Sequence, residues 1–313
     1  MPIKHMGKIL KSNQSAIIAA LLFMLFLFCI SCGVPVKHYG SLMSAGYAGF
    51  EYRADYEGAV RDIPYTDSDD DMLKLDVFRA QAAGPLPVFV FIHGGYWKSG
   101  HRKYYASFAK SLNPEGFTVV LVDYRLYPDV TYPEFVEDCV KALNWTAENI
   151  AEYGGDPKRM YVAGSSAGSH IAAMIFLDDQ FRDKLRFDPM KVKGVLLTSG
   201  AYDFDKDNLL DEEILREVLG PQENYDKAQP IKYLRADIPP MLIVNGDRDP
   251  LTSEAQASRF AGELKETGAP VEYLVIPGGD HHSVGLGMTA GNEDEVFEAF
   301  IRFAEKTGAF SAD

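Results

Sequence analysis

Cysteine is scarce in this sequence, which contains three in 313 residues. Cys29 and Cys32 lie at the end of an N-terminal apolar segment, and Cys139 stands alone in a stretch of helical character. Small secreted domains with little core depend on several paired cysteines, so this count excludes a disulfide framework. Because Cys139 has no histidine near it in a motif, we interpret it as a packed core residue and not as a nucleophile.

Basic residues are also few, with 31 lysines and arginines against 45 aspartates and glutamates. The formal net charge of −14 argues against nucleic-acid binding and against attachment to anionic membranes through charge. The acidic run 67–71 lacks the glycine and distal glutamate of a helix–loop–helix calcium site, so we expect a hairpin turn there. No histidine stands at metal-ligand spacing from the adjacent pair His281 and His282, and we predict neither a metal nor another cofactor.

The apolar run Ala16–Ile30 is shorter than the ~20 residues that a membrane-spanning helix needs. It follows a basic segment and precedes Ser31-Cys32, an order typical of a secretory signal that resembles a bacterial lipobox. We predict a lipoprotein signal peptide over 1–31 and a lipid on Cys32. The protein would then be exported and anchored to a membrane surface, facing the periplasm or the exterior of a bacterium. The alternatives are simple cleavage and an uncleaved anchor helix.

The rest of the chain has no internal repeat, no low-complexity tract and no second domain boundary. We expect a tether or N-terminal arm over 32–58 and one catalytic domain over 59–313. Hydrophobic residues make up 47% of the chain, enough for a large core. Apolar runs such as Pro87–Ile92 are typical of strands buried on both faces, and they alternate with helical runs. This alternation predicts an α/β fold, with a mostly parallel central sheet and helices on both faces.

The expected strands are Val60–Tyr65, Leu73–Phe78, Pro87–Ile92, Phe117–Val122, Met160–Ala163, Val192–Thr198, Met241–Val244 and Val271–Ile276. The expected helices are Tyr104–Leu112, Pro133–Ala151, the run ending at Leu177, Ser253–Thr267 and Asn292–Lys306. The polar stretch 204–236 has a helical middle, Glu212–Leu219, and we expect it to form a cap-like insertion over part of the site.

One motif carries a candidate nucleophile. Gly164-Ser165-Ser166-Ala167-Gly168 is a Gly-x-Ser-x-Gly sequence between an expected strand and an expected helix. A serine raised on such a sharp turn has a strained backbone, and the two glycines remove Cβ atoms that would clash there. The N–H of Ala167 would lie at a helix N-terminus, where it can stabilise an oxyanion. We predict that Ser166 is the nucleophile; the alternative is a glycine- and serine-rich loop that fits by coincidence.

The other polar motifs follow the ends of expected strands, where ligands bind in parallel sheets. After Ser166 come an acidic turn and then a histidine pair, so the order along the chain is serine, acid, histidine. We favour Asp249 as the acid; Asp247 could brace the loop instead, and Asp203 is the main rival. His281 and His282 would point in opposite directions in an extended loop, so only one could face Ser166. The alternative for both histidines is a solvated turn.

The motif His93-Gly94-Gly95-Tyr96-Trp97 also follows an expected strand. Two glycines let the backbone approach a substrate carbonyl, so the N–H groups of Gly94 and Gly95 are candidate oxyanion donors. We interpret His93 as a brace for this loop. Tyr96 and Trp97 are candidate walls of the substrate pocket, with ordinary core aromatics as the alternative.

Together these motifs resemble the esterase/lipase branch of the α/β-hydrolase superfamily, which includes hormone-sensitive-lipase-like carboxylesterases and arylformamidases. The resemblance is carried by His93-Gly94-Gly95, Asp123-Tyr124-Arg125-Leu126, Gly154-Gly155-Asp156-Pro157, Gly164-Ser165-Ser166-Ala167-Gly168, Asp249-Pro250 and Asp280-His281. It implies the α/β-hydrolase fold, a Ser166–Asp249–His281 triad, and oxyanion donors at Gly94, Gly95 and Ala167. The arylformamidase pattern of Asp, His and an aromatic residue selects His281 over His282.

The resemblance implies a serine hydrolase of the carboxylesterase kind, acting on a small-molecule ester through an acyl-enzyme intermediate. One alternative is an arylformamidase, similar to kynurenine formamidases, that uses the same groups on an N-formyl amide. A third is a non-catalytic surface lipoprotein that keeps the fold for binding. The complete set of serine, acid, histidine and paired glycines counts against the third, because a binding protein does not need all four.

Overall fold

The computed structural model describes residues 56, 58–206, 208–289 and 294–311. The signal peptide over 1–31, the lipid on Cys32 and almost all of the 32–58 tether lie outside the described residues and stay predictions. The chain divides into two compact units between Ala54 and Asp55, and the described residues belong to the second unit. Within the described part of the chain, no helix is both long enough and apolar enough to cross a membrane.

A single eight-stranded sheet forms the centre of this unit, in the order β1-β2-β4-β3-β5-β6-β7-β8. The six strands β4, β3, β5, β6, β7 and β8 run parallel to one another. Strand β2 is antiparallel to both β1 and β4. The mostly parallel sheet is therefore confirmed. Its strands are β1 Ala59–Pro64, β2 Lys74–Phe78, β3 Leu86–Ile92, β4 Thr118–Val122, β5 Gly155–Ser165, β6 Gly194–Thr198, β7 Met241–Gly246 and β8 Val271–Ile276.

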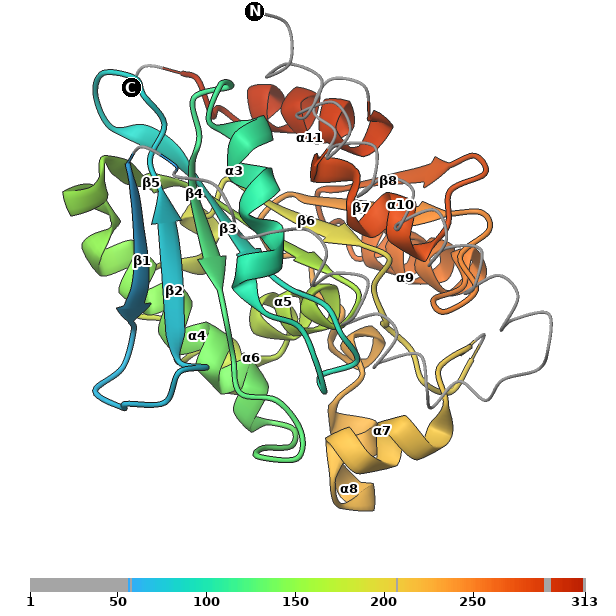
Figure 1. The fold of residues 1–313 in the computed structure, drawn as a ribbon. Coiled ribbons are helices and arrows are strands. Elements are labelled where there is room, and N and C mark those ends of the chain that lie inside the picture. The colour runs from blue at the N-terminus through green and yellow to red at the C-terminus, as the bar shows by residue number, and fades with distance from the viewer. Residues whose placement is uncertain (1–55, 57, 207, 290–293, 312–313) are drawn as a thin grey trace, which may run out of the picture. The chain divides into compact units, whose positions relative to one another are not determined.

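Helices cover both faces of the sheet, as Figure 1 shows. Strand β3 shows why both faces of the sheet need covering helices. All its residues are buried, and those from Val88 to Ile92 alternate between two apolar clusters. One cluster contains Val88 and Val90 with residues of α4, α5 and α9, and the other contains Phe89 and Phe91 with residues of α3 and α11. The helices are α3 Ala106–Leu112, α4 Glu134–Asn149, α5 Ala167–Leu177, α6 Asp179–Arg182, α7 Glu212–Leu219, α8 Gln222–Lys227, α9 Glu254–Glu266, α10 His281–Gly285 and α11 Glu295–Lys306.

The largest difference from the sequence-based boundaries is at β5, which runs from Gly155 to Ser165 where Met160–Ala163 was expected, and short 3₁₀ turns account for two of the differences at helix ends. The helix expected from residue 104 is a 3₁₀ turn, η2 (Arg102–Tyr105), that continues into α3. The helix expected to reach residue 151 changes from α4 into η3 (Ile150–Tyr153), and the turns η4 (Pro189–Lys191) and η6 (Gly287–Thr289) had no counterpart in the prediction. The acidic run 67–71 forms the turn between β1 and β2 as expected, closed by a bond from Tyr65 N–H to Leu73 O of 3.2 Å.

The insertion 204–236 contains α7 at the predicted residues, followed by α8 and the turn η5 (Pro230–Tyr233) that the sequence did not predict. Helices α7 and α8 stand together at the lower end of the view in Figure 1. Helix α8 is short and has no buried residue, so it lacks the apolar period that would have revealed it. Lys98 forms an ion pair with Glu217 of α7. The insertion therefore contacts the loop that follows His93-Gly94-Gly95.

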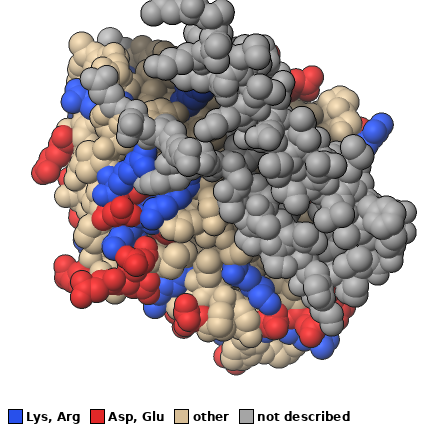
Figure 2. All heavy atoms as spheres, viewed as in Figure 1, with Lys and Arg blue, Asp and Glu red and all other residues tan. Residues whose placement is uncertain are grey.

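Charged side chains of both signs share the surface. On the described part of the face in Figure 2, acidic and basic side chains lie next to one another and do not gather into separate fields. Many of them are ion pairs between exposed groups, such as Arg186 with Glu148 and Lys306 with Glu272. Exposed pairs of this kind contribute at most about 1 kcal/mol each to the free energy of unfolding, so burial of the two apolar clusters dominates stability.

Candidate active site

Ser166 lies on a strained turn between β5 and α5. Its φ of 54° and ψ of −118° are uncommon for a residue other than glycine, and such a conformation costs about 1–3 kcal/mol. Surrounding hydrogen bonds hold it in place: Ser166 N–H donates to Thr198 O at 2.9 Å, and His170 N–H donates to Ser166 O at 3.1 Å. The strand–turn–helix setting that the Gly-x-Ser-x-Gly pattern predicts is therefore present.

Close backbone approach accounts for the glycines of this motif. A Cβ atom on Gly164 would overlap the backbone of Gly168, and a Cβ atom on Gly168 would overlap the carbonyl oxygen of Ile92. Only glycine fits at these two positions without moving the backbone. The turn that carries Ser166 is thereby packed against the end of β3.

His281 and Asp249 meet beyond the ends of β7 and β8. His281 Nδ1 lies 3.0 Å from Asp249 Oδ1 and 2.9 Å from Asp249 Oδ2, and both residues are at least 90% buried. Since a carboxylate only accepts hydrogen bonds, Nδ1 carries the proton and the Nε2 lone pair is left to act as a base. This is the tautomer that a serine-activating histidine needs.

The loop after β7 holds the Asp249 carboxylate in place. Oδ1 accepts the N–H groups of Leu251 and Thr252, both at 2.9 Å, and Oδ2 accepts the Thr252 hydroxyl at 2.9 Å. Burial opposes ionisation, but the hydrogen bonds from His281, Thr252 and Leu251 outweigh it and hold the pKa of Asp249 below its usual range. Sequence reasoning missed Thr252, although an aspartate followed three residues later by threonine is a local turn signal.

The two rival acids have other partners. Asp203, after β6, pairs with Arg259 of α9 at 2.7 Å. Asp247 accepts the N–H of Gly278 at 2.7 Å, which is the loop-bracing contact that the sequence allowed. Of the three candidate aspartates, only Asp249 has a contact with His281 among the described residues. The geometry therefore brings together the acid and the histidine that we favoured.

The histidine pair does not lie in an extended loop, and that expectation was wrong. His281 and His282 begin helix α10, because Asp280 caps it: its carboxylate accepts the N–H groups of His282 at 3.0 Å and Ser283 at 2.8 Å. The Ser283 hydroxyl accepts the Asp280 N–H at 2.9 Å and completes a capping box. Consecutive helical side chains still diverge, and the His281 ring is the one that forms the hydrogen bonds with Asp249, at 2.9 and 3.0 Å. The sequence feature that could have predicted the start of this helix is Asp280 followed three residues later by Ser283.

Helix α10 also lies against the nucleophile turn. A Cβ atom on Gly285 would come within 2.6 Å of Ser165 Oγ, so the last turn of α10 touches the residue next to Ser166. His282, on the same helix, is partly buried, and its burial lowers its pKa. Helix α10 thus joins the histidine end of the site to the serine end.

The glycine loop after β3 lies beside Ser166. A Cβ atom on Gly94 would be 2.7 Å from Ser165 O and 3.0 Å from Ser166 Cβ, which places this backbone next to the candidate nucleophile. Gly95 has a φ of 125°, a conformation that favours glycine, and its carbonyl accepts the N–H groups of Lys98 and Ser99 at 3.0 Å. Ala167 is the first residue of α5, where its N–H belongs to the helix N-terminus.

Trp97 is buried and packs against other aromatic rings. It is 1% exposed, and its ring lies 5.0 Å from His170 and 6.2 Å from Phe135. Tyr96 is partly buried, and both residues have a positive φ, of 56° and 55°. A pocket role for Tyr96 and Trp97 stays a prediction. Cys139 is fully buried in α4, and burial raises the pKa of its thiol, so it packs in the core as expected.

No cluster of three or more His, Cys, Asp or Glu side chains that could hold a metal ion occurs in the described ranges. The groups at this edge of the sheet are a strained serine, a buried Asp–His pair and a glycine loop. They are suited to nucleophilic catalysis with general-base assistance.

Known proteins with similar sequences are esterases. The BD-FAE family model matches residues 75–264. Esterase LipQ of Mycobacterium tuberculosis is 29% identical over 75% of this chain and 59% of its own length. A probable isoprenylcysteine α-carbonyl methylesterase of Arabidopsis thaliana is 26% identical over 84% of this chain and 60% of its own length. The chain thus spans about 60% of these curated relatives.

Solved structures of esterases share the fold. A variant of the esterase rPPE has a TM-score of 0.73 at 22% identity and covers 94% of this chain and 97% of its own. A truncated carbohydrate esterase from gut microbiota has a TM-score of 0.69 at 19% identity, over 81% of this chain and 98% of its own. The central sheet, its helices and these similarities show the α/β-hydrolase fold. This chain belongs to the BD-FAE family, within the esterase/lipase branch of the α/β-hydrolases.

Proposed function

We propose that this protein is a serine hydrolase that cleaves carboxylic esters of small molecules through an acyl-enzyme intermediate. The observation that carries the proposal is the buried contact of 2.9 Å between His281 Nδ1 and Asp249 Oδ2, at the sheet edge where strained Ser166 lies. The names of the relatives, an esterase and a methylesterase, favour an ester as the substrate.

In the proposed reaction, Ser166 Oγ attacks the ester carbonyl while His281 Nε2 takes its proton. Asp249 keeps the imidazole oriented and stabilises the imidazolium that forms. The N–H groups of Gly94, Gly95 and Ala167 stabilise the negative oxygen of the tetrahedral intermediate. His281 then gives its proton to the leaving alcohol, and the acyl group stays on Ser166. Finally His281 activates a water molecule, which releases the carboxylic acid and restores the serine.

The test compares the full-length wild type with Ser166→Ala, and uses Ser68→Ala on the exposed β1–β2 turn as the matched control. We expect wild type to hydrolyse p-nitrophenyl butyrate and to react with a fluorophosphonate probe. Ser166→Ala should lose about 10³-fold or more in kcat and should not be labelled, because no other hydroxyl replaces the nucleophile. Ser68→Ala should behave as wild type.

Other outcomes separate the alternatives. Deformylation of N-formylkynurenine more efficient than ester turnover would move the assignment to an arylformamidase. Wild type that is neither labelled nor active, under conditions that label a known esterase, would support a binding protein. Activity that survives in Ser166→Ala would overturn the assignment of the nucleophile.

We further propose that the protein is exported and anchored to a membrane by a lipid on Cys32. The support is the basic segment, the apolar run Ala16–Ile30 and Ser31-Cys32 in the sequence. Expression of the full chain in a bacterium fed tritiated palmitate tests this. Wild type and the matched control Cys139→Ser should carry label, whereas Cys32→Ser should not. Equal labelling of Cys32→Ser and wild type would contradict the lipid assignment.

A further inference from the structure

The motif Asp123-Tyr124-Arg125 begins at the end of β4, and the reaction proposed above leaves it without a role. Asp123 has no exposed surface. Its carboxylate contacts residues at both ends of a single loop, the stretch 93–102 that carries Gly94 and Gly95. A buried carboxylate with this set of partners needs an explanation beyond core packing.

The contacts at the far end of the loop come from two consecutive residues. Asp123 Oδ1 accepts the N–H of Arg102 at 2.5 Å, and Oδ2 is bonded by the Arg102 guanidinium. His101 Nδ1 lies 3.0 Å from Oδ2. At the near end, His93 Nε2 lies 3.4 Å from Oδ1, an ion-pair contact that is attractive when Nε2 carries a proton as well as Nδ1, which faces Gly94 O. One carboxylate therefore holds the two ends of the loop together.

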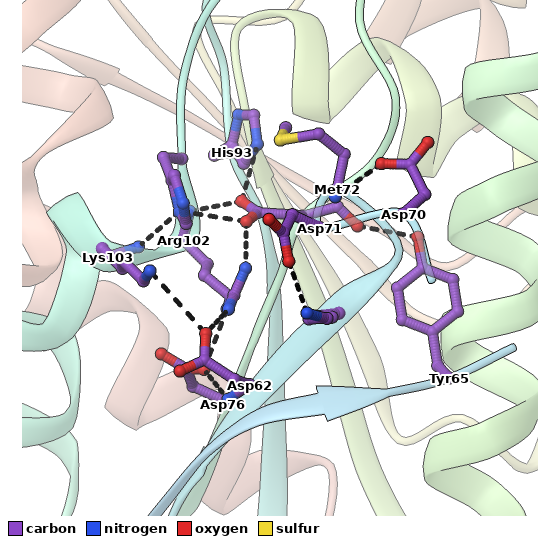
Figure 3. Close-up of polar contacts among 12 residues, drawn as sticks. Asp62, Tyr65, Asp70, Asp71, Met72, Asp76, His93, Arg102 and Lys103 are labelled. Carbon is purple, nitrogen blue, oxygen red and sulfur yellow. Dashed lines mark hydrogen bonds and ion pairs between the residues drawn. The ribbon is translucent and has the colours of Figure 1, made fainter. Parts of the chain in front are cut away.

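Arg102 is itself held by two further carboxylates. It is 1% exposed, its Nε donates to Asp76 Oδ1 at 2.8 Å, and its Nη2 pairs with Asp62. Figure 3 shows Arg102 among Asp62, Asp76 and His93. Burial opposes ionisation of Asp123, yet the contacts with His101 and His93 hold its pKa well below the usual range. Asp123 is therefore a permanent negative charge at neutral pH.

His93 connects Asp123 to the glycine backbone. Its Nδ1 donates to Gly94 O at 2.8 Å, which fixes the orientation of the peptide that follows Gly94. The ring of Tyr124 stacks on His93 with centroids 4.5 Å apart, and the Tyr124 hydroxyl donates to His93 O at 2.9 Å. A Cβ atom on Gly100 would overlap the His93 ring, so the far end of the loop also closes on this side chain.

We infer that Asp123 is a positioning residue, which orients the Gly94–Gly95 backbone for oxyanion stabilisation by closing the 93–102 loop at both ends. This inference rests on the proposed function, since it assigns Asp123 to the same reaction. Oxyanion donors act only when they already point at the developing charge, and a displacement of about 1 Å can cost about 10²-fold in rate.

The test uses Asp123→Asn in the full chain, which keeps the shape of the side chain but removes its charge. The matched control is Asp138→Asn, since Asp138 is also unexposed and accepts from Arg125 at 2.7 and 2.8 Å, outside the loop. Three quantities are measured: kcat and KM for p-nitrophenyl butyrate, the Ki of an alkyl trifluoromethyl ketone, and amide hydrogen exchange of residues 94–101. The ketone reports on the donors because its serine adduct carries the oxyanion.

We expect Asp123→Asn to lower kcat by about 10-fold to 100-fold with KM within twofold of wild type. The Ki of the ketone should rise by the same factor, and residues 94–101 should exchange faster. Asp138→Asn should change none of these quantities by more than twofold, even if its melting temperature falls as far as that of Asp123→Asn. If Asp123→Asn does not fold, His101→Ala removes one contact at the half-exposed end of the loop, and the same pattern is expected at about 3-fold to 10-fold.

An Asp123→Asn protein with normal kcat and Ki, or with unchanged exchange in residues 94–101, would overturn the inference and leave Asp123 a purely structural residue. Failure of the proposed function is distinguishable, because it appears as inactive, unlabelled wild type. In that case the exchange comparison between the Asp123 and Asp138 variants still decides whether Asp123 orders the loop.

Discussion

Single residues decide which carboxylate supports the histidine. Asp203, Asp247 and Asp249 all follow strands at the same edge of the sheet, and all have short contacts. Their partners differ in chemistry: Arg259 for Asp203, a backbone N–H for Asp247 and His281 for Asp249. A carboxylate stabilises an imidazolium only if it contacts that ring, so the partner of each aspartate decides its role.

Replacement of Asp249 by asparagine should lower kcat for ester hydrolysis by about 10⁴-fold, because the wrong imidazole tautomer is then favoured. Asp203→Asn is the matched control, since Asp203 is similarly buried and is also contacted by a side chain of a distant helix, Arg259 of α9. It should lower the melting temperature but leave kcat within tenfold of wild type. Steady-state kinetics and circular dichroism measure both. A larger loss of kcat in Asp203→Asn than in Asp249→Asn would transfer the acid role to Asp203.

At the scale of elements, helix α10 positions His281 although it has only five residues. Isolated helices of this length are unstable in water, so its formation depends on packing and on the Asp280 cap. The cap uses an exposed carboxylate at one end, and at the other end Gly285 touches Ser165. The orientation of the catalytic candidate His281 therefore depends on an exposed residue outside the proposed triad.

Asp280→Ala should destabilise the start of α10 by about 1 kcal/mol and lower kcat/KM by about 3-fold to 10-fold, since His281 then spends less time facing Asp249. Asp280→Asn supplies another N-cap oxygen and should retain most of the activity. Kinetics with p-nitrophenyl butyrate compare the two variants. If both lose the same activity, the charge of Asp280 matters and the capping explanation fails.

At the scale of the whole molecule, one buried histidine links the sheet, the site and the insertion. His170 lies on α5, one turn after Ser166, and its Nε2 donates to Ala228 O of the insertion at 2.7 Å. It has no exposed surface, and burial lowers its pKa from 6.5 to about 4. The histidine is therefore neutral in the folded protein over most of the acid range in which it is charged in the unfolded chain.

This difference predicts an acid-sensitive fold. Above pH 6.5 both states hold His170 neutral, so the free energy of unfolding does not depend on it. Between pH 6.5 and about 4 the unfolded chain binds the extra proton, and the free energy of unfolding falls, by up to about 3 kcal/mol. Urea unfolding between pH 4 and 7.5 measures the slope. His170→Gln, which can still donate to Ala228 O, should reduce this slope. His282 adds to the slope in the same direction, because its pKa is also lowered.

The same slope in His170→Gln and wild type would assign the acid sensitivity to other groups. Aspartates with lowered pKa, Asp156 and Asp249 among them, titrate below their usual value of 3.8 and lie outside this window. Burial raises the pKa of Asp178 and Asp294, but these carboxylates bind protons more readily in the folded state, so they raise the free energy of unfolding as the pH falls. His170→Gln leaves both aspartates in place, so the difference between the two slopes reports on His170. His282→Gln should also reduce the slope, because burial lowers the pKa of His282, and the double variant should reduce it further than either single variant.

The amino-acid sequence by itself determined the strands, most helices, the serine turn and the placement of the polar motifs at one edge of the sheet. These features depend on the spacing of apolar residues, on glycines at sharp turns and on the direction of the strands. Each of these can be read from a short stretch of the sequence or from a regular repeat. The predicted boundaries of α7 agree with the structure and those of β3 differ by one residue, and Ser166 lies on the turn between strand and helix that the pattern predicts. The helices missed among the described residues are the short ones, α6, α8 and α10, which have four to six residues each and depend on caps or bury little.

The tertiary structure alone decided the partners. Arg259 pairs with Asp203 from 56 positions away, a contact that the sequence did not predict. The Asp249–His281 pair, 32 positions apart, was expected only from the family resemblance, since no local pattern specifies it. Asp123 and Arg102 form a buried cluster from strands and turns that are distant in the sequence. Such contacts depend on how β-strands order themselves in the sheet, and this order places β4 beside β3 although a helix separates them in the chain. Residue types predict the chemistry of this edge; the packing of distant segments decides which group acts on which.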